Sequence, residues 1–244
     1  MAIWSDPSGP TTTVRPDLRH DALPADAGLR RYMLQVYNYM ASGVLLTGIV
    51  AMLFANSDFG QQVMMNGGAL RWVIILAPLA FVMALSFGAM RMSLGAMRMT
   101  FWAFAVVMGL SMSTLFMVYT DASIAAAFFS TAAAFLGLSL YGYTTKRDLS
   151  GFGTFLVMGL IGILVAMLIN LFVQSSAMAL IISIIGVLLF AGLTAYDTQK
   201  IKQTYYAVAG SDFAGKAVVL GALTLYLDFI NMFTFLLNLM GSRD

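Results

Sequence analysis

The sequence predicts an all-α, polytopic membrane protein with seven transmembrane helices. Of its 244 residues, 60% are hydrophobic and only 10% are charged, whereas soluble domains carry about 25% charged residues. The apolar residues form continuous runs close to the roughly 20 residues that cross a bilayer, without the alternation typical of a transmembrane β-barrel. Helices satisfy their own backbone hydrogen bonds in lipid, so these runs indicate a helix bundle.

The chain divides into a polar tail, residues 1–31, and a transmembrane domain, residues 32–244. The tail holds four of the five prolines and the single histidine, His20. Such a proline-rich polar composition predicts a disordered cytoplasmic tail. No short apolar stretch precedes the first long apolar run, so the tail does not have the pattern of a signal peptide.

Seven apolar segments follow the tail. They are predicted at residues 33–55, 70–91, 100–119, 122–143, 152–173, 177–197 and 217–240. The third and fourth are separated only by "TDA", and the fifth and sixth only by "QSSA", so both turns must be tight.

Basic residues predict the orientation, because cytoplasmic connections of membrane proteins carry an excess of Lys and Arg. With the N-terminus inside, eleven basic residues lie on the cytoplasmic side and two, Arg71 and Arg243, on the other. The eleven are Arg15, Arg19, Arg30, Arg31, Arg91, Arg98, Lys146, Arg147, Lys200, Lys202 and Lys216. The C-terminus therefore lies outside.

Two aspartates stand out because ionisable residues inside membrane spans are costly and commonly mark ion or proton paths. Asp228 lies about 11 residues into the last segment, or about 16 Å along a helix, close to mid-membrane. Asp197 is expected at the cytoplasmic end of the sixth segment. It is therefore predicted to lie nearer the membrane surface than Asp228.

Small and polar residues share one face of each of these two segments. In the last segment the face comprises Gly221, Thr224, Asp228, Asn231 and Asn238, and in the sixth it comprises Ser183, Gly186, Thr194 and Asp197. Such stripes turn away from lipid, towards other helices or water. We therefore interpret Thr194, Thr224 and Asn231 as a polar face that supports the two aspartates.

If the two stripes face each other, the two carboxyl groups form a pair in a poorly solvated site. Desolvation and like-charge repulsion both oppose ionisation of the two groups together, so the pair would share a proton. This arrangement suits a pH sensor or a site for a hard cation such as calcium. The alternatives are that Asp228 is a buried carboxyl group that serves only packing, and that Asp197 is simply solvated beside Lys200 and Lys202.

Several other functions are excluded by the residues present. All four lysines are expected in connections between the segments, which excludes a retinal pigment bound through a lysine inside a helix. His20 lies in the tail, which excludes an intramembrane serine protease with a histidine base. The sequence contains no cysteine, no His cluster for a transition metal and no glycine-rich phosphate loop. We predict neither an enzyme nor a nucleic-acid-binding protein, and no cofactor.

The two aspartate-bearing stretches resemble the motifs of the Bax inhibitor-1 family, also called the transmembrane Bax inhibitor motif family. They read "FAGLTAYDTQKIK" from Phe190 to Lys202 and "GALTLYLDFINMFTFLLNLMG" from Gly221 to Gly241. The order of a charged tail, seven spans and the two motifs last is also similar, and the resemblance covers the chain from about residue 30 onwards.

This resemblance implies a seven-helix bundle in which the last helix is surrounded by the other six. It also implies a pH-sensitive calcium leak, with Asp197 and Asp228 as the sensor. An arginine of the second helix is described in the family as a latch on the first aspartate, and Arg91 is the only candidate here. Some bacterial relatives interact with membrane proteases, and the short chain without cysteine is typical of the bacterial branch.

The function predicted from the sequence is a pH-sensitive calcium leak channel in a bacterial inner membrane, gated by the two aspartates. Two alternatives stay open. One is a proton-coupled transporter that uses Asp228 as the proton carrier, and the other is a non-transporting regulator that binds a membrane protease or a stress partner. The expected ligands are calcium ions or protons. The expected surroundings are the lipid bilayer.

The charge distribution makes a testable prediction about topology. A reporter that is active only in the cytoplasm is expected to give a signal when fused after Arg31 and no signal when fused after Asp244, because seven spans place the two ends on opposite sides. A cytoplasmic signal from both fusions would mean that one of the seven segments does not span the membrane.

Overall fold

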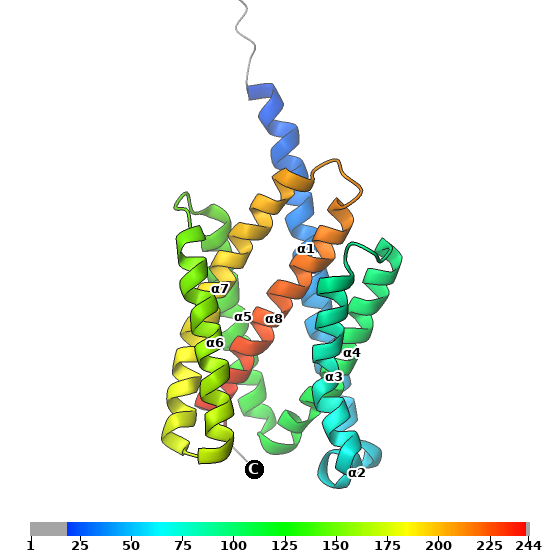
Figure 1. The fold of residues 1–244 in the computed structure, drawn as a ribbon, viewed down its shortest axis with the longest axis vertical. Coiled ribbons are helices and arrows are strands. Elements are labelled where there is room, and N and C mark those ends of the chain that lie inside the picture. The colour runs from blue at the N-terminus through cyan, green and yellow to red at the C-terminus, as the bar shows by residue number, and fades with distance from the viewer. Residues whose placement is uncertain (1–18, 243–244) are drawn as a thin grey trace, which may run out of the picture.

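The computed structural model describes residues 19–242, which form an all-helical bundle (Figure 1). Its helices are α1 (Arg19–Ala55), α2 (Asp58–Asn66), α3 (Gly68–Gly88), α4 (Leu94–Val118), α5 (Asp121–Thr144), α6 (Ser150–Val173), α7 (Ser176–Val208) and α8 (Ala214–Met240). All of them except α2 contain a stretch long and apolar enough to cross a membrane. The predicted architecture of seven spans is therefore confirmed.

Helix α8 is the centre of the bundle. In its most apolar stretch 67% of the residues are buried, against 11% in α3 and in α6. It packs directly against α1, α4, α5 and α7, whereas α3 packs mainly on α4 and α6 on α7 (Figure 1). The last helix is thus central, as expected, with four of the other spans in direct contact and two outside them.

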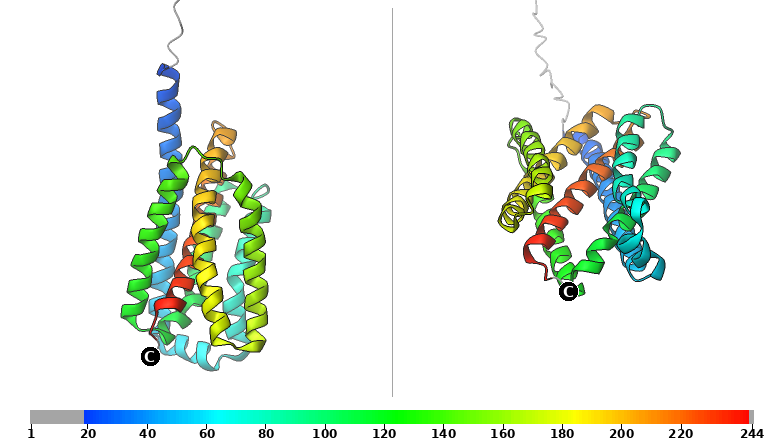
Figure 2. Two further views of the ribbon diagram at one scale, coloured as in Figure 1. Left: turned by 90° about the vertical axis from the view of Figure 1, so that its left-hand side faces the viewer. Right: turned by 60° about the horizontal axis from the view of Figure 1, so that its bottom comes forward.

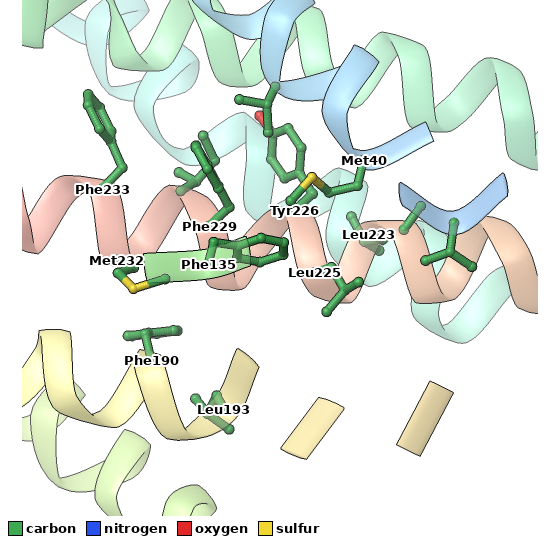
Figure 3. Close-up of a cluster of buried hydrophobic side chains, with 14 of the residues drawn as sticks. Met40, Phe135, Phe190, Leu193, Leu223, Leu225, Tyr226, Phe229, Met232 and Phe233 are labelled. Atoms are coloured by element: carbon green, nitrogen blue, oxygen red, sulfur yellow. The ribbon is translucent and has the colours of Figure 1, made fainter. Parts of the chain in front are cut away.

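Aromatic and aliphatic side chains fill the space around α8. Figure 3 shows Tyr226 of α8 pointing towards α1 beside Met40, with Phe190 and Leu193 of α7 on the opposite side of the helix. The Tyr226 hydroxyl group is 2.6 Å from the Thr47 hydroxyl group of α1. This hydrogen bond satisfies a fully buried phenol and fixes α1 against α8.

Helix α1 begins earlier than expected. Residues 1–18 of the predicted disordered tail lie outside the described residues, but residues 19–31 are helical, so the prediction of disorder is wrong for them. Leu29 and Tyr32 are buried, and the Tyr32 ring packs on Tyr205 of α7 with 5.4 Å between centroids. This packing joins the part of α1 around Tyr32 to the end of α7.

Helix α7 also continues beyond its predicted end at residue 197. It runs for 33 residues to Val208, or about 50 Å at 1.5 Å per residue. The extension carries Lys200 and Lys202, which are therefore on a helix and not in a connection. As a consequence Asp197 lies inside α7, and its predicted position at the end of the helix is wrong.

The short helix α2 was not predicted. It has only nine residues, too few to span a membrane, and lies across one end of the bundle between α1 and α3 (Figure 2, left). Ser57 begins the helix by accepting a hydrogen bond of 3.0 Å from the Gly60 amide. Val63 and Met64 are buried, whereas Phe59 and Met65 are exposed.

The turn between α4 and α5 also holds the end of the chain. Thr120 accepts a hydrogen bond of 3.2 Å from the Ser123 amide and thereby caps α5. The Ser242 amide donates to the Ser123 hydroxyl group over 2.9 Å, and the Tyr119 hydroxyl group donates to Asn238 over 2.7 Å. These bonds fix the C-terminal end of α8.

Glycine permits close approach at several helix pairs. A Cβ atom at Gly142 of α5 would collide with the backbone carbonyl of Ala195 in α7, and one at Gly186 would lie 2.6 Å from the Phe235 ring of α8. Gly159 and Gly192 similarly face leucine side chains of a neighbouring helix, whereas Gly162 has open space beside it. Because the Ala195 backbone cannot move aside as a side chain can, Gly142 sets the distance between α5 and α7.

Replacement of Gly142 by alanine is therefore expected to destabilise the fold. The added methyl group must push α5 away from α7, at a cost of about 1–3 kcal/mol in the free energy of unfolding, seen as a lower midpoint of thermal unfolding in detergent. Gly137→Ala on the same helix is the control, since a Cβ atom there meets nothing within 4 Å. Equal midpoints for the two variants would contradict the proposed role of Gly142.

Candidate functional site

The candidate site lies in the hairpin formed by α7 and α8. Asp197 is 11 residues from the end of α7 at Val208, and Asp228 is 14 residues from the start of α8 at Ala214. At 1.5 Å per residue these separations are about 17 Å and 21 Å. The two helices are antiparallel neighbours joined by a short connection, so the two aspartates lie at similar depth.

The structure brings the two aspartates together. The carboxyl groups of Asp197 and Asp228 lie close enough to interact electrostatically. A carboxylate can only accept hydrogen bonds, whereas a protonated carboxyl group donates one. Two carboxyl groups at this separation can share a hydrogen bond only when one of them carries a proton.

The site has very little access to solvent. Asp228 is only 4% exposed, and Asp197 is partly buried. One oxygen of Asp228, Oδ2, is buried and has no hydrogen-bond partner within residues 19–242. Leaving a buried acceptor without a partner costs about 1–3 kcal/mol, so this oxygen is a place where a proton, a water molecule or a cation would be stabilised.

The close approach of α7 and α8 depends on a small residue two turns from Asp228. A Cβ atom at Gly221 would lie 3.3 Å from Ile201 of α7, which is one turn beyond Asp197. Gly221 and Asp228 therefore face α7 together. A larger side chain at Gly221 would separate the two helices on the side of the site nearest their connection.

A lysine supplies the positive charge that acts on the pair. Lys200 follows Asp197 by one turn of α7 and interacts electrostatically with it. The Lys200 ammonium group also lies 5.9 Å from the centre of the Tyr196 ring. Lys200 thus gives the site a cation on its own helix, at the end nearer the α7–α8 connection.

The expected supporting polar residues do not bond to the aspartates. Thr194, Thr224 and Asn231 each donate to a backbone carbonyl one turn earlier in their own helix, namely those of Phe190, Leu220 and Leu227. Asn231 lines a cavity shared with α3 and α4. In this structure the carboxyl pair therefore has no hydrogen bond from any of the three.

The structure does not bring Arg91 to Asp197. Arg91 lies just beyond α3, is exposed, and forms no salt bridge with any residue of the described range. The nearby end of α3 is instead held by Lys216 of α8, whose ammonium group donates to the Ala89 carbonyl over 3.2 Å. A bond between Arg91 and Asp197 would require a different arrangement of this end of α3.

Residues not singled out from the sequence connect the site to α5. The Thr198 hydroxyl group, next to Asp197, donates to Ser139 of α5 over 3.5 Å. Gln199 accepts a bond from the Leu149 amide over 2.8 Å and donates to the Arg147 carbonyl over 2.9 Å. Most of these partners are backbone groups of the α5–α6 connection, so no pattern in the sequence points to them.

Two aspartates supply only part of the coordination shell of a calcium ion. Calcium is bound by six to eight oxygen ligands, and two aspartates supply at most four carboxylate oxygens. Within residues 19–242 no group of three or more His, Cys, Asp or Glu side chains is placed to hold a metal ion. A cation at this pair would therefore keep water in part of its coordination shell.

Comparison with known proteins agrees with the motifs and the fold. The sequence model of the family described as "Inhibitor of apoptosis-promoting Bax1" matches residues 29–244. The chain is 47% identical over 219 residues to the inner membrane protein YbhL of Escherichia coli K12, which covers 89% of this chain and 94% of the relative. It is 46% identical over 219 residues to the protein RP147 of Rickettsia prowazekii, covering 89% of this chain and 92% of that protein. It is also 42% identical over 231 residues to a protein of Caulobacter vibrioides, covering 91% of this chain and 92% of that protein.

The family model extends over almost all of the transmembrane part of the chain, and the relatives match over nearly their whole lengths. The family motifs named above carry the two aspartates that meet between α7 and α8. The chain belongs to the Bax inhibitor-1 family.

Proposed function

We propose that this protein is a pH-sensitive leak pathway for calcium ions, controlled by the Asp197–Asp228 pair. The observation that carries the proposal is the closeness of two carboxyl groups in the interface of α7 and α8, with one buried Asp228 oxygen that has no hydrogen-bond partner among the described residues. Structural carboxyl groups in a membrane interior are normally paired with cations or donors. Here the two carboxyl groups face each other instead. Such a pair is suited to release a proton and bind a cation in its place.

The membrane in which this occurs is inferred from the relatives. The Escherichia coli relative is described as an inner membrane protein, and the seven spans here are all apolar enough for the same setting. We therefore place the chain in the bacterial inner membrane. The basic residues favour a cytoplasmic N-terminus, which puts the α7–α8 connection and Lys200 on the cytoplasmic side.

Two cavities along α8 beyond Asp228 contain polar side chains, one against α3 and α4 and the other against α6 and α7. Asn231 contributes to a cavity of about 380 Å³ that is also lined by Ser111 of α4. Towards the C-terminal end of α8, Asn238 and Ser183 line a second cavity of about 650 Å³. Amide and hydroxyl groups replace part of the hydration shell of a moving cation, and they carry no charge that would bind it permanently.

Protonation explains why such a leak would depend on pH. With at least one carboxylate ionised, the pair attracts a divalent cation. When both groups carry a proton, the site is neutral and its attraction for calcium is lost. Calcium flux is therefore expected to fall as the pH is lowered through the range in which the second proton binds.

Asp228→Asn is the decisive variant. Asparagine keeps the size and hydrogen-bonding capacity of the side chain but cannot ionise, so calcium flux into proteoliposomes is expected to lose its pH dependence while the fold is retained. Asp148→Asn is the matched control. Hydrogen bonds from the side chain and backbone of Ser150 hold the pKa of Asp148 below its ordinary value, so Asp148 stays charged at roughly pH 5 to 8.

The same assay separates the proposal from its alternatives. Flux in Asp228→Asn that still follows pH like the wild type would show that the aspartate serves packing alone. Proton movement that depends on a co-transported substrate would identify a proton-coupled transporter. Absence of calcium and proton flux in correctly folded wild-type protein would leave a regulator, for example one that binds a membrane protease.

Arg91 makes a separate prediction. We propose that it pairs with Asp197 in a closed arrangement that differs from the one described here, in which Arg91 is exposed. Arg91→Ala would then remove the partner of a poorly solvated charge and raise the basal calcium leak. Arg98→Ala, an exposed arginine of α4 on the same side of the bundle, is the control. An unchanged leak in Arg91→Ala with intact folding would exclude Arg91 from the mechanism.

A further inference from the structure

An open seam runs between α1 and α5 along the side of the bundle. Both helices pack on α8, but they hardly touch each other. The seam contains two separate cavities, one near the N-terminal part of α1 and one near the α1–α2 connection. Since both lie between membrane-spanning helices, lipid is the surrounding medium that can fill them.

The first cavity is lined by apolar and polar side chains of α1 and α5. Its volume is about 360 Å³. The residues that line it are Met33, Leu34, Leu136 and Leu140, together with Arg30, Tyr37, Ser139 and Tyr143. None of these eight residues is acidic, and Arg30 is exposed at the mouth of the cavity.

A second cation lies beside Tyr143 of the same cavity. The Lys202 ammonium group donates to the Tyr143 carbonyl over 2.7 Å and lies 5.2 Å from the centre of the Tyr143 ring. Arg30 and Lys202 thus approach Tyr143 from α1 and α7. Basic residues and tyrosines gathered where spans leave the membrane are the chemistry that recognises the phosphate of an anionic lipid.

The other cavity in the seam has the opposite electrostatic character. Its volume is about 510 Å³, and its single charged lining residue is the acidic Asp121. A negatively charged rim disfavours an anionic headgroup. The charged residues at the two ends of the seam therefore have opposite signs. Only the end at Arg30 carries the positive charge that an anionic lipid requires.

We propose that the cavity between α1 and α5 at Arg30 binds an anionic phospholipid. The phosphate group lies at Arg30, and the first part of an acyl chain lies on Leu136 and Leu140. Ser139 in the lining accepts the hydrogen bond from Thr198, the neighbour of Asp197. A lipid in this cavity therefore contacts α5 at the point where α5 is bonded to the helix of the carboxyl pair. The binding site itself stands independently of the proposed calcium leak.

The proposal is tested by lipid binding to the purified full-length protein in detergent. Retention of phosphatidylglycerol is compared with that of phosphatidylcholine of the same acyl chains by native mass spectrometry. The wild type is expected to bind phosphatidylglycerol more tightly, and Arg30→Gln is expected to weaken that binding by about fivefold, since one basic residue near the surface contributes about that much. Binding of phosphatidylcholine should change little.

Arg31→Gln is the matched control, because Arg31 is an adjacent exposed arginine that does not line the cavity. A second variant, Leu140→Trp, fills the cavity from an exposed position and is expected to reduce binding of both lipids. An equal loss of phosphatidylglycerol in Arg30→Gln and Arg31→Gln, or no preference of the wild type for phosphatidylglycerol, would overturn the proposal. No outcome depends on calcium flux, so failure here is distinct from failure of the proposed function.

Discussion

The contact between Asp197 and Asp228 places the strongest constraint on this bundle. A carboxyl group near mid-membrane cannot face lipid without a large loss of solvation, so the helix that carries Asp228 must be enclosed. Enclosure is what the structure shows: α8 is the most buried span, and four other spans pack directly on it. The central position of α8 and the composition of its neighbours follow from this requirement.

Enclosing α8 requires close helix packing, which in a membrane depends on small residues and shape, because lipid provides no hydrophobic driving force between helices. Gly221 allows α7 to approach α8, Gly142 allows α5 to approach α7, and Gly186 accommodates the Phe235 ring. The hydrogen bond between Thr47 and Tyr226 fixes α1 on a further side. The same close packing keeps Asp228 almost completely buried.

The helix extensions beyond the apolar spans give the bundle a second set of contacts. The N-terminal part of α1 packs on the end of α7 through Tyr32 and Tyr205, and Gln199 binds the α5–α6 connection. Lys202 holds the end of α5, and Lys216 holds the end of α3. These contacts lie at the end of the bundle that carries Lys200. Most of them involve α7, the helix of Asp197.

Composition and the spacing of apolar runs were sufficient to predict the fold class, the seven spans and the membrane setting, because a helix must be long and apolar to cross a bilayer whatever its neighbours are. The aspartates could be selected in the same way, since a charge within an apolar run is unusual in itself. Helix ends were less predictable, because the part of α7 after Asp197 is polar and meets α1 through Tyr205 and Tyr32, which are far apart in the sequence. Whether Asp197 meets Asp228 depended on the length of α7, on Gly221 and on the antiparallel packing of two helices. The isolation of Arg91, the bonds of Gln199 and the seam at Arg30 were likewise decided by tertiary structure, because each involves residues far apart in the chain or backbone groups that carry no sequence signal.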